Sequence, residues 1–83
     1  MATSDAGDLP WENVLALPDR RTADACAAEL RSAGADVDDP VHESGFRRWT
    51  VVVRVPRDDR AGRVVAGQAG AAIRRGGWHL GAS

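Results

Sequence analysis

The chain has 83 residues with 11 basic and 12 acidic side chains, which gives a formal net charge of −1 at pH 7. This length suits a single domain with a thin core, and no apolar stretch is long enough to cross a membrane. The near-neutral charge argues against a domain that binds nucleic acid through its phosphates, and the ordinary apolar fraction of 43% argues against disorder outside the ends.

The first strand and helix follow a short polar segment. Residues 1–9 have neither a basic start nor an apolar run, so we expect a disordered tail and a cytoplasmic protein. Residues 11–17 form a mostly apolar run between two prolines, which predicts a central strand. Residues 19–33 carry small or apolar side chains at helical spacing, with Asp19 as the N-cap and Gly34 as the stop, which predicts a helix.

An edge strand and a central strand are predicted next. Residues 35–41 contain three acids and a proline, which are typical of an edge strand, and residues 43–45 form a turn. Residues 49–55 alternate, which is the pattern of a strand with two different faces. The side chains expected to meet the helices are Trp49, Val51, Val53 and Val55, and those expected on the open face are Thr50, Val52 and Arg54.

The second helix is predicted over residues 58–75, because acids begin it and arginines end it. Its expected buried stripe comprises Ala61, Val65, Gln68, Ala69, Ala72 and Ile73. Two glycines then break the helix before a short strand over residues 78–80, and residues 81–83 are expected to be a tail.

The order β-α-β-β-α-β predicts the fold class. We expect one α+β domain over residues 10–80, a ferredoxin-like sandwich with a four-stranded antiparallel sheet and two helices on one face. Such a sheet leaves its second face bare, and that face is where we expect a partner to bind.

The sequence contains no recognisable pattern of residues for a catalytic site or a metal site. Cys26 lies on the core stripe of the first helix, and His42 and His79 could approach each other only across a dimer. The glycines of the second helix lack the lysine and the strand context of a phosphate-binding loop. We therefore predict no enzyme activity, no cofactor and no metal site.

Two compositional features leave alternatives open. Residues 1–46 carry ten acids and three arginines, whereas residues 47–83 carry two acids and eight arginines. These charges predict either surface ion pairs or a patch that steers a charged partner. The three tryptophans either fill gaps between the many alanines or include an anchor of a protein interface.

Nucleic-acid binding is disfavoured by the predicted open face. Sheets that bind RNA present aromatic side chains on their central strands, and none is expected here. A basic cluster of Arg47, Arg48 and Arg54 is the one feature in favour of it.

A family resemblance rests on two segments. Residues 24–41 read Asp-Ala-Cys-Ala-Ala-Glu-Leu-Arg-Ser-Ala-Gly-Ala-Asp-Val-Asp-Asp-Pro-Val, and Gly77-Trp78 precede the last strand. Over about residues 14–80 the chain resembles the bacterial regulator-of-ribonuclease-E protein B family. The resemblance implies a ferredoxin-like sandwich that binds and inhibits an endoribonuclease. The element order is also similar to amino-acid-binding ACT domains, which implies a small ligand at the loop of residues 18–20.

We thus expect a small regulatory protein that acts by protein contact, through its open sheet face or an edge strand. The expected interface residues are Val14, Ala16, Thr50, Val52, Arg54 and His79. The expected partner is a protein, either a second copy in a symmetric dimer or, as the resemblance implies, a ribonuclease. The alternatives are a small-ligand regulatory domain and, less favoured, an RNA-binding domain.

Overall fold

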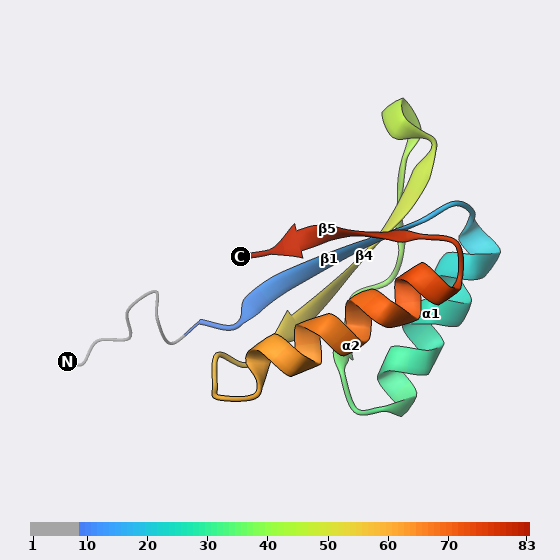
Figure 1. Ribbon diagram of the computed structural model, residues 1–83. Coiled ribbons are helices and arrows are strands. Elements are labelled where there is room, and N and C mark those ends of the chain that lie inside the picture. The colour runs from blue at the N-terminus through green and yellow to red at the C-terminus, as the bar shows by residue number, and fades with distance from the viewer. Residues whose placement is uncertain (1–8) are drawn as a thin grey trace.

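The computed structural model describes residues 9–83 and has an α+β fold, as predicted (Figure 1). Its elements are β1 (Trp11–Leu17), α1 (Arg20–Ser32), β2 (Asp36–Val37), β3 (Val41–Glu43), the 3-10 turn η2 (Ser44–Phe46), β4 (Arg48–Val55), α2 (Ala61–Arg74) and β5 (Trp78–Ala82). The predicted tail of residues 1–9 lies almost wholly outside the described part. Neither helix is long and apolar enough to cross a membrane.

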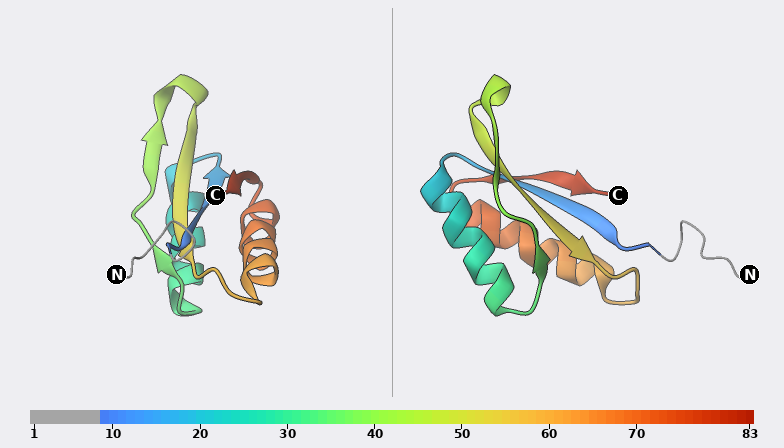
Figure 2. Two further views of the ribbon diagram at one scale, coloured as in Figure 1. Left: turned by 90° about the vertical axis from the view of Figure 1, so that its left-hand side faces the viewer. Right: turned by 180° about the vertical axis from the view of Figure 1, so that it is seen from behind.

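The strands form one antiparallel sheet with the order β2-β4-β1-β5, and β3 also pairs with β4. Strands β1 and β4 are paired along the whole of β1, from Trp11 opposite Val55 to Leu17 opposite Trp49. Both helices lie on the same side of this sheet, and the hairpin of β3 and β4 projects beyond the helices (Figures 1 and 2).

The prediction of four strands is wrong because the expected strand over residues 35–41 is divided into β2 and β3. The backbone N–H of Asp38 still donates to the carbonyl of Val52 at 3.0 Å, and strand pairing resumes where Val41 lies opposite Thr50. Pro40 lies in the gap and has no N–H to donate to the neighbouring strand. Both pieces therefore lie along the same edge of β4.

The helix ends follow local hydrogen bonding. Asp19 caps α1 as predicted, because its carboxylate accepts a hydrogen bond of 2.8 Å from the N–H of Thr22. Helix α2 begins three residues later than predicted. The carboxylate of Asp58 accepts from the N–H of Arg60, and its carbonyl accepts from the N–H of Ala61, so these residues form a turn before the helix.

The expected tail over residues 81–83 instead belongs to the sheet. Strand β5 continues to Ala82, and Ser83 exchanges two backbone hydrogen bonds with Glu12, of 2.8 and 3.2 Å. Gly81 has a φ of +137°, close to a register shift between β1 and β5. The backbone of this segment finds its hydrogen-bond partners on β1, although its side chains give no strand signal.

The core joins large side chains of the sheet to small side chains of the helices. The largest fully buried apolar residues are Leu15, Leu17, Val51, Val53 and Val55, all on β1 or β4. The helices contribute mainly alanines, together with Cys26 and Leu30. Ile73, which was expected in the core stripe of α2, is 58% exposed, and Ala71 contacts the core beside Ala72.

Gly77 lies where the end of α2 meets β1. A Cβ atom there would overlap the carbonyl oxygen of Ala16 and come within 2.7 Å of Leu17 Cδ1. We predict that Gly77→Ala lowers the free energy of unfolding by about 1–3 kcal/mol, as overpacking of a core does.

Gly62→Ala is the matched control, because a Cβ at that helical position would meet no atom within 4 Å. It should leave stability unchanged or raise it by up to about 1 kcal/mol. Urea unfolding followed by circular dichroism measures both variants. Equal stability of the two variants would contradict the close approach at Gly77.

Candidate functional site

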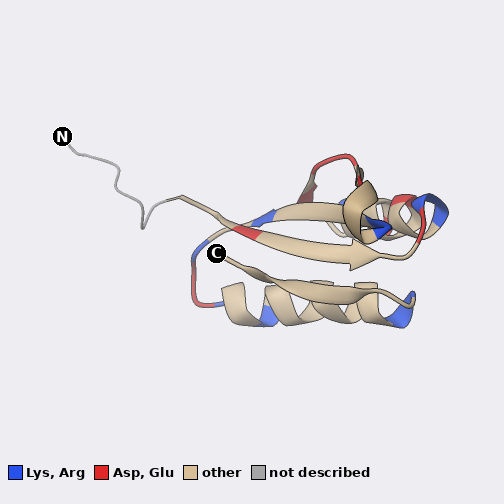
Figure 3. Cartoon of the chain, turned by 90° about the horizontal axis from the view of Figure 1, so that it is seen from above, with Lys and Arg blue, Asp and Glu red and all other residues tan. Residues whose placement is uncertain are grey.

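The sheet has one face without helices, and the strand register shows which residues lie on it. Leu15 belongs to the core beneath the helices, so its neighbours Val14 and Ala16 point to the other side. Val14 lies opposite Val52, and Ala16 lies opposite Thr50. Because directly opposed residues share a face, these four predicted interface residues lie together on the open face. The strands of the sheet are mostly uncharged (Figure 3).

An apolar stripe crosses this face over β3, β4, β1 and β5. We define the apolar stripe as Val14, Ala16, Val41, Thr50, Val52, Trp78 and Leu80. Trp78 is 41% exposed, Leu80 40% and Val41 59%, whereas Ala16 and Thr50 are buried. The contact surface therefore comes mainly from the valines and from side chains that were not predicted as interface residues.

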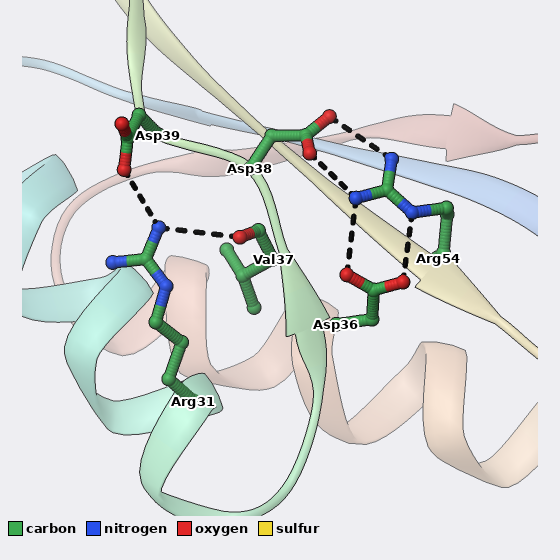
Figure 4. A network of polar contacts seen from close by, with 6 residues as sticks. All are labelled: Arg31, Asp36, Val37, Asp38, Asp39 and Arg54. Carbon is green, nitrogen blue, oxygen red and sulfur yellow. Dashed lines mark hydrogen bonds and ion pairs between the residues drawn. The ribbon is translucent and has the colours of Figure 1, made fainter.

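Ion pairs border the apolar stripe. At one end, the guanidinium of Arg54 donates to both carboxylates of Asp36 and Asp38, with distances of 2.5 to 3.1 Å (Figure 4). These hydrogen bonds hold the pKa values of both carboxyl groups below their ordinary values. At the other end, Arg48 donates to Glu43 at 3.2 Å. The predicted interface residue Arg54 therefore lies at the end of the apolar stripe, and its positive charge is already neutralised by Asp36 and Asp38.

A second arginine holds the interrupted edge from the helix side. Arg31 of α1 donates to the carbonyl of Val37 at 3.2 Å and to the carboxylate of Asp39 at 2.9 Å (Figure 4). Each acid of the segment 36–39 is therefore paired with an arginine. These pairs are largely exposed, so each contributes little to stability.

The charge asymmetry of the sequence forms ion pairs between the two halves of the chain. Besides Arg54, the arginines Arg74 and Arg75 both donate to Glu29, at 3.3 and 2.8 Å. The predicted basic cluster does not form, because Arg54 is neutralised by two acids and Arg47 lies at the hairpin turn.

His79 does not lie on the open face with the other predicted interface residues. It pairs with Leu15 in the register, and its Nε2 lies 2.6 Å from Oδ1 of Asn13. Asn13 is fully buried, and its Nδ2 donates to Oε1 of Gln68 at 2.8 Å. His79 is therefore placed on the helix side, as the exposed end of a hydrogen-bonded chain that continues through the buried amides of Asn13 and Gln68. This chain was not predicted. The sequence contained a signal for the buried position of Asn13, because Asn13 lies two residues from Leu15 on the same strand and so points to the same, helix-covered side.

The structure places two of the tryptophans among packing contacts on the helix side and the third on the open face. The guanidinium of Arg57 lies over Trp11, and that of Arg20 lies over Trp49, which also stacks on His42 at 4.9 Å. Trp49 packs against the core. Trp78 is the one on the open face.

Reactive groups are sparse in the described part. Within residues 9–83, no three His, Cys, Asp or Glu side chains are grouped closely enough to hold a metal ion. Cys26 is buried, and burial raises the pKa of its thiol, which disfavours the reactive thiolate.

The chain matches no protein-family model, no curated protein and no solved structure. The resemblance of residues 14–80 to the regulator-of-ribonuclease-E protein B family therefore stays a prediction.

The lowered pKa values of Asp36 and Asp38 predict a dependence of stability on pH. A carboxyl group with a depressed folded-state pKa stabilises the fold above its ordinary pKa, and this contribution is lost as the pH falls through the folded-state value. We expect Arg54→Gln to reduce the loss of stability between about pH 5 and pH 2.

Urea unfolding at several pH values measures this effect, with Arg60→Gln as a control that removes an arginine outside the network. The same acid dependence in Arg54→Gln and the wild type would contradict the role of Arg54.

Proposed function

We propose that this chain is a non-catalytic regulatory protein that acts by protein contact through the open face of a ferredoxin-like sandwich, with a second copy as its partner. The strand order supports that fold when β2 and β3 are counted as one interrupted edge strand next to β4. The two helices on one side of the sheet also support it.

The exposure of Trp78 and Leu80 on a face without helices carries the proposal. A sheet face that remains in water usually carries polar side chains at alternate positions. Here the alternate positions of β1, β4 and β5 carry Val14, Val52, Trp78 and Leu80. Tryptophan is also one of the residue types enriched among interface anchors.

The face is a better contact surface than either edge of the sheet. One edge is interrupted between β2 and β3, where residues 38–40 carry two acids and a proline. The other edge, β5, contains the irregularity at Gly81. Interruptions of this kind disfavour the pairing of edges between molecules.

The area of the face sets the expected strength of association. Taking the seven residues of β1 as the length of the face, at about 3.3 Å per residue, and four strand rows about 4.8 Å apart gives an upper value of roughly 450 Å². Two copies would bury about 900 Å², which is below the roughly 1,200–2,000 Å² of stable complexes. We therefore expect a weak dimer that depends on concentration.

The alternative functions have less support. In the loop of residues 18–20, Asp19 already caps α1 and the Arg20 guanidinium lies over Trp49, which leaves few groups for an amino-acid ligand. An RNA partner would meet Arg54 neutralised by two acids. A ribonuclease, as the family resemblance implies, would use the same open face and would compete with dimer formation.

Val52→Asp tests the open face. Val52 is partly exposed, so the variant should keep its circular dichroism spectrum while two carboxylates repel each other across the dimer. Sedimentation equilibrium from about 5 to 500 µM should show a rising mean mass for the wild type and a constant monomer mass for the variant. Ile73→Asp, which alters an exposed residue of α2, should associate as the wild type does.

Val53→Asp tests the assignment of the faces. Val53 is fully buried on the helix side, and a buried unpaired charge costs about 3–5 kcal/mol, which is comparable to the stability of a small domain. We expect loss of the cooperative thermal transition. Unfolding of both the Val52 and the Val53 variants would contradict the assignment, and a wild type that stays monomeric would overturn the dimer.

A further inference from the structure

A groove lies between the two helices, on the side of the sheet away from the apolar stripe. It has a volume of about 650 Å³ and runs between the C-terminal end of α1 and the first three turns of α2. This volume is within the usual range of about 300–1,000 Å³ for small-molecule sites. We propose that the groove binds a small free monocarboxylic acid with an apolar body, as a site separate from the sheet face.

The walls of the groove are apolar and are kept apart by small residues. Leu30 and Val64 face it from the two helices, together with Ala33 and Ala71. Gly67 lies between them on α2, and a Cβ atom there would meet nothing within 4 Å. The missing side chain leaves open space in the wall, which an apolar ligand can fill.

A single buried side chain supplies a polar group to this groove. Gln68 lines the groove and is only 7% exposed, and its Oε1 accepts the hydrogen bond from Asn13. Its Nε2 donates to no described residue. Because Gln68 lines the groove and its Oε1 is already engaged by Asn13, Nε2 is the polar atom of this side chain that remains for a ligand within residues 9–83. It offers N–H donors to an oxygen acceptor.

The charges around the groove favour an anion. Four charged residues line it, and two of them are acids held in ion pairs: Glu29 with Arg74 and Arg75, and Asp36 with Arg54. Arg63 of α2 forms no ion pair with any residue from 9 to 83. The charge left for a ligand is therefore positive.

The three features together define the ligand class. The apolar body would lie against Leu30 and Val64, and the carboxylate would accept from Gln68 Nε2 and pair with Arg63. A neutral alcohol of the same shape would lose the ion pair, and an amine would be repelled by Arg63.

The probe is 4-phenylbutyrate, compared with 4-phenylbutanol and 4-phenylbutylamine by isothermal titration calorimetry and by chemical-shift mapping in ¹⁵N-labelled protein. We expect the acid to bind at least about tenfold more tightly than the alcohol or the amine, as a charge-assisted contact predicts. The shift changes should centre on Leu30, Gly67 and Gln68. No binding of the acid, or equal affinity for the three probes, would overturn the proposal.

Gly67→Leu tests the location, because its side chain would fill the groove. The matched control is Gly62→Leu, on the same helix with equally open surroundings but outside the groove. The first variant should lose binding and the second should keep it. Equal affinity of the two variants would overturn the proposal.

Gln68→Glu tests the donor group. The new carboxylate can still accept from Asn13, but it replaces the N–H donors facing the groove with a negative charge. Affinity for the acid should fall by more than about tenfold, and the amine should become the better ligand. Arg63→Gln, at an exposed site, should weaken the acid without changing the alcohol. Since Val52→Asp leaves the groove intact, it should bind the acid as the wild type does, so this test is separate from that of the sheet face.

Discussion

The buried amide of Asn13 links the sheet to helix α2 and to the last strand. A polar side chain in the middle of the central strand costs about 1–3 kcal/mol if its hydrogen bonds are unmet, which is more than a typical bond contributes when formed. Gln68 satisfies it from α2, and His79 satisfies it from β5. Helix α2 must therefore lie where Gln68 reaches β1, and this position also sets one wall of the interhelical groove.

The two surfaces with a proposed role differ in chemistry because the helices cover only one side of the sheet. On the open face, the ion pairs of Arg48 and Arg54 and the carboxylate of Glu12 lie along the borders, so the centre is left apolar and nearly without charge. On the helix side, small residues keep the walls of the groove apart and leave one amide and one arginine available. The first arrangement suits another protein surface, and the second suits a small amphiphilic molecule.

Local patterns in the sequence predicted those elements whose limits are set by neighbouring residues. Strand β1 and helix α1 agree with their predicted ranges, because prolines, Asp19 and Gly34 mark their ends. The misses depend on contacts between distant segments. The division of the edge strand at Pro40 was missed because β2 and β3 both pair with the eight-residue strand β4. Residues 81–83 were predicted as a tail because their place in the sheet depends on hydrogen bonds to the backbone of Glu12. In the candidate site, the alternation of residues along β1 and β4 correctly predicted that Val14 and Val52 lie on the open face. The faces on which Trp78 and His79 lie could not be predicted, because they depend on the register between β5 and β1.

The uneven core limits how this chain can change during evolution. Its large buried side chains come from β1 and β4, whereas the helices approach the sheet through alanines and one cysteine, with Leu30 as an exception. Positions on the strands can drift among apolar residues of similar volume at a modest cost. The alanine positions accept only residues as small as themselves, since any larger side chain must push a helix away from the sheet. Divergent homologues should therefore retain small residues on the inner helix faces long after their surfaces have lost detectable similarity.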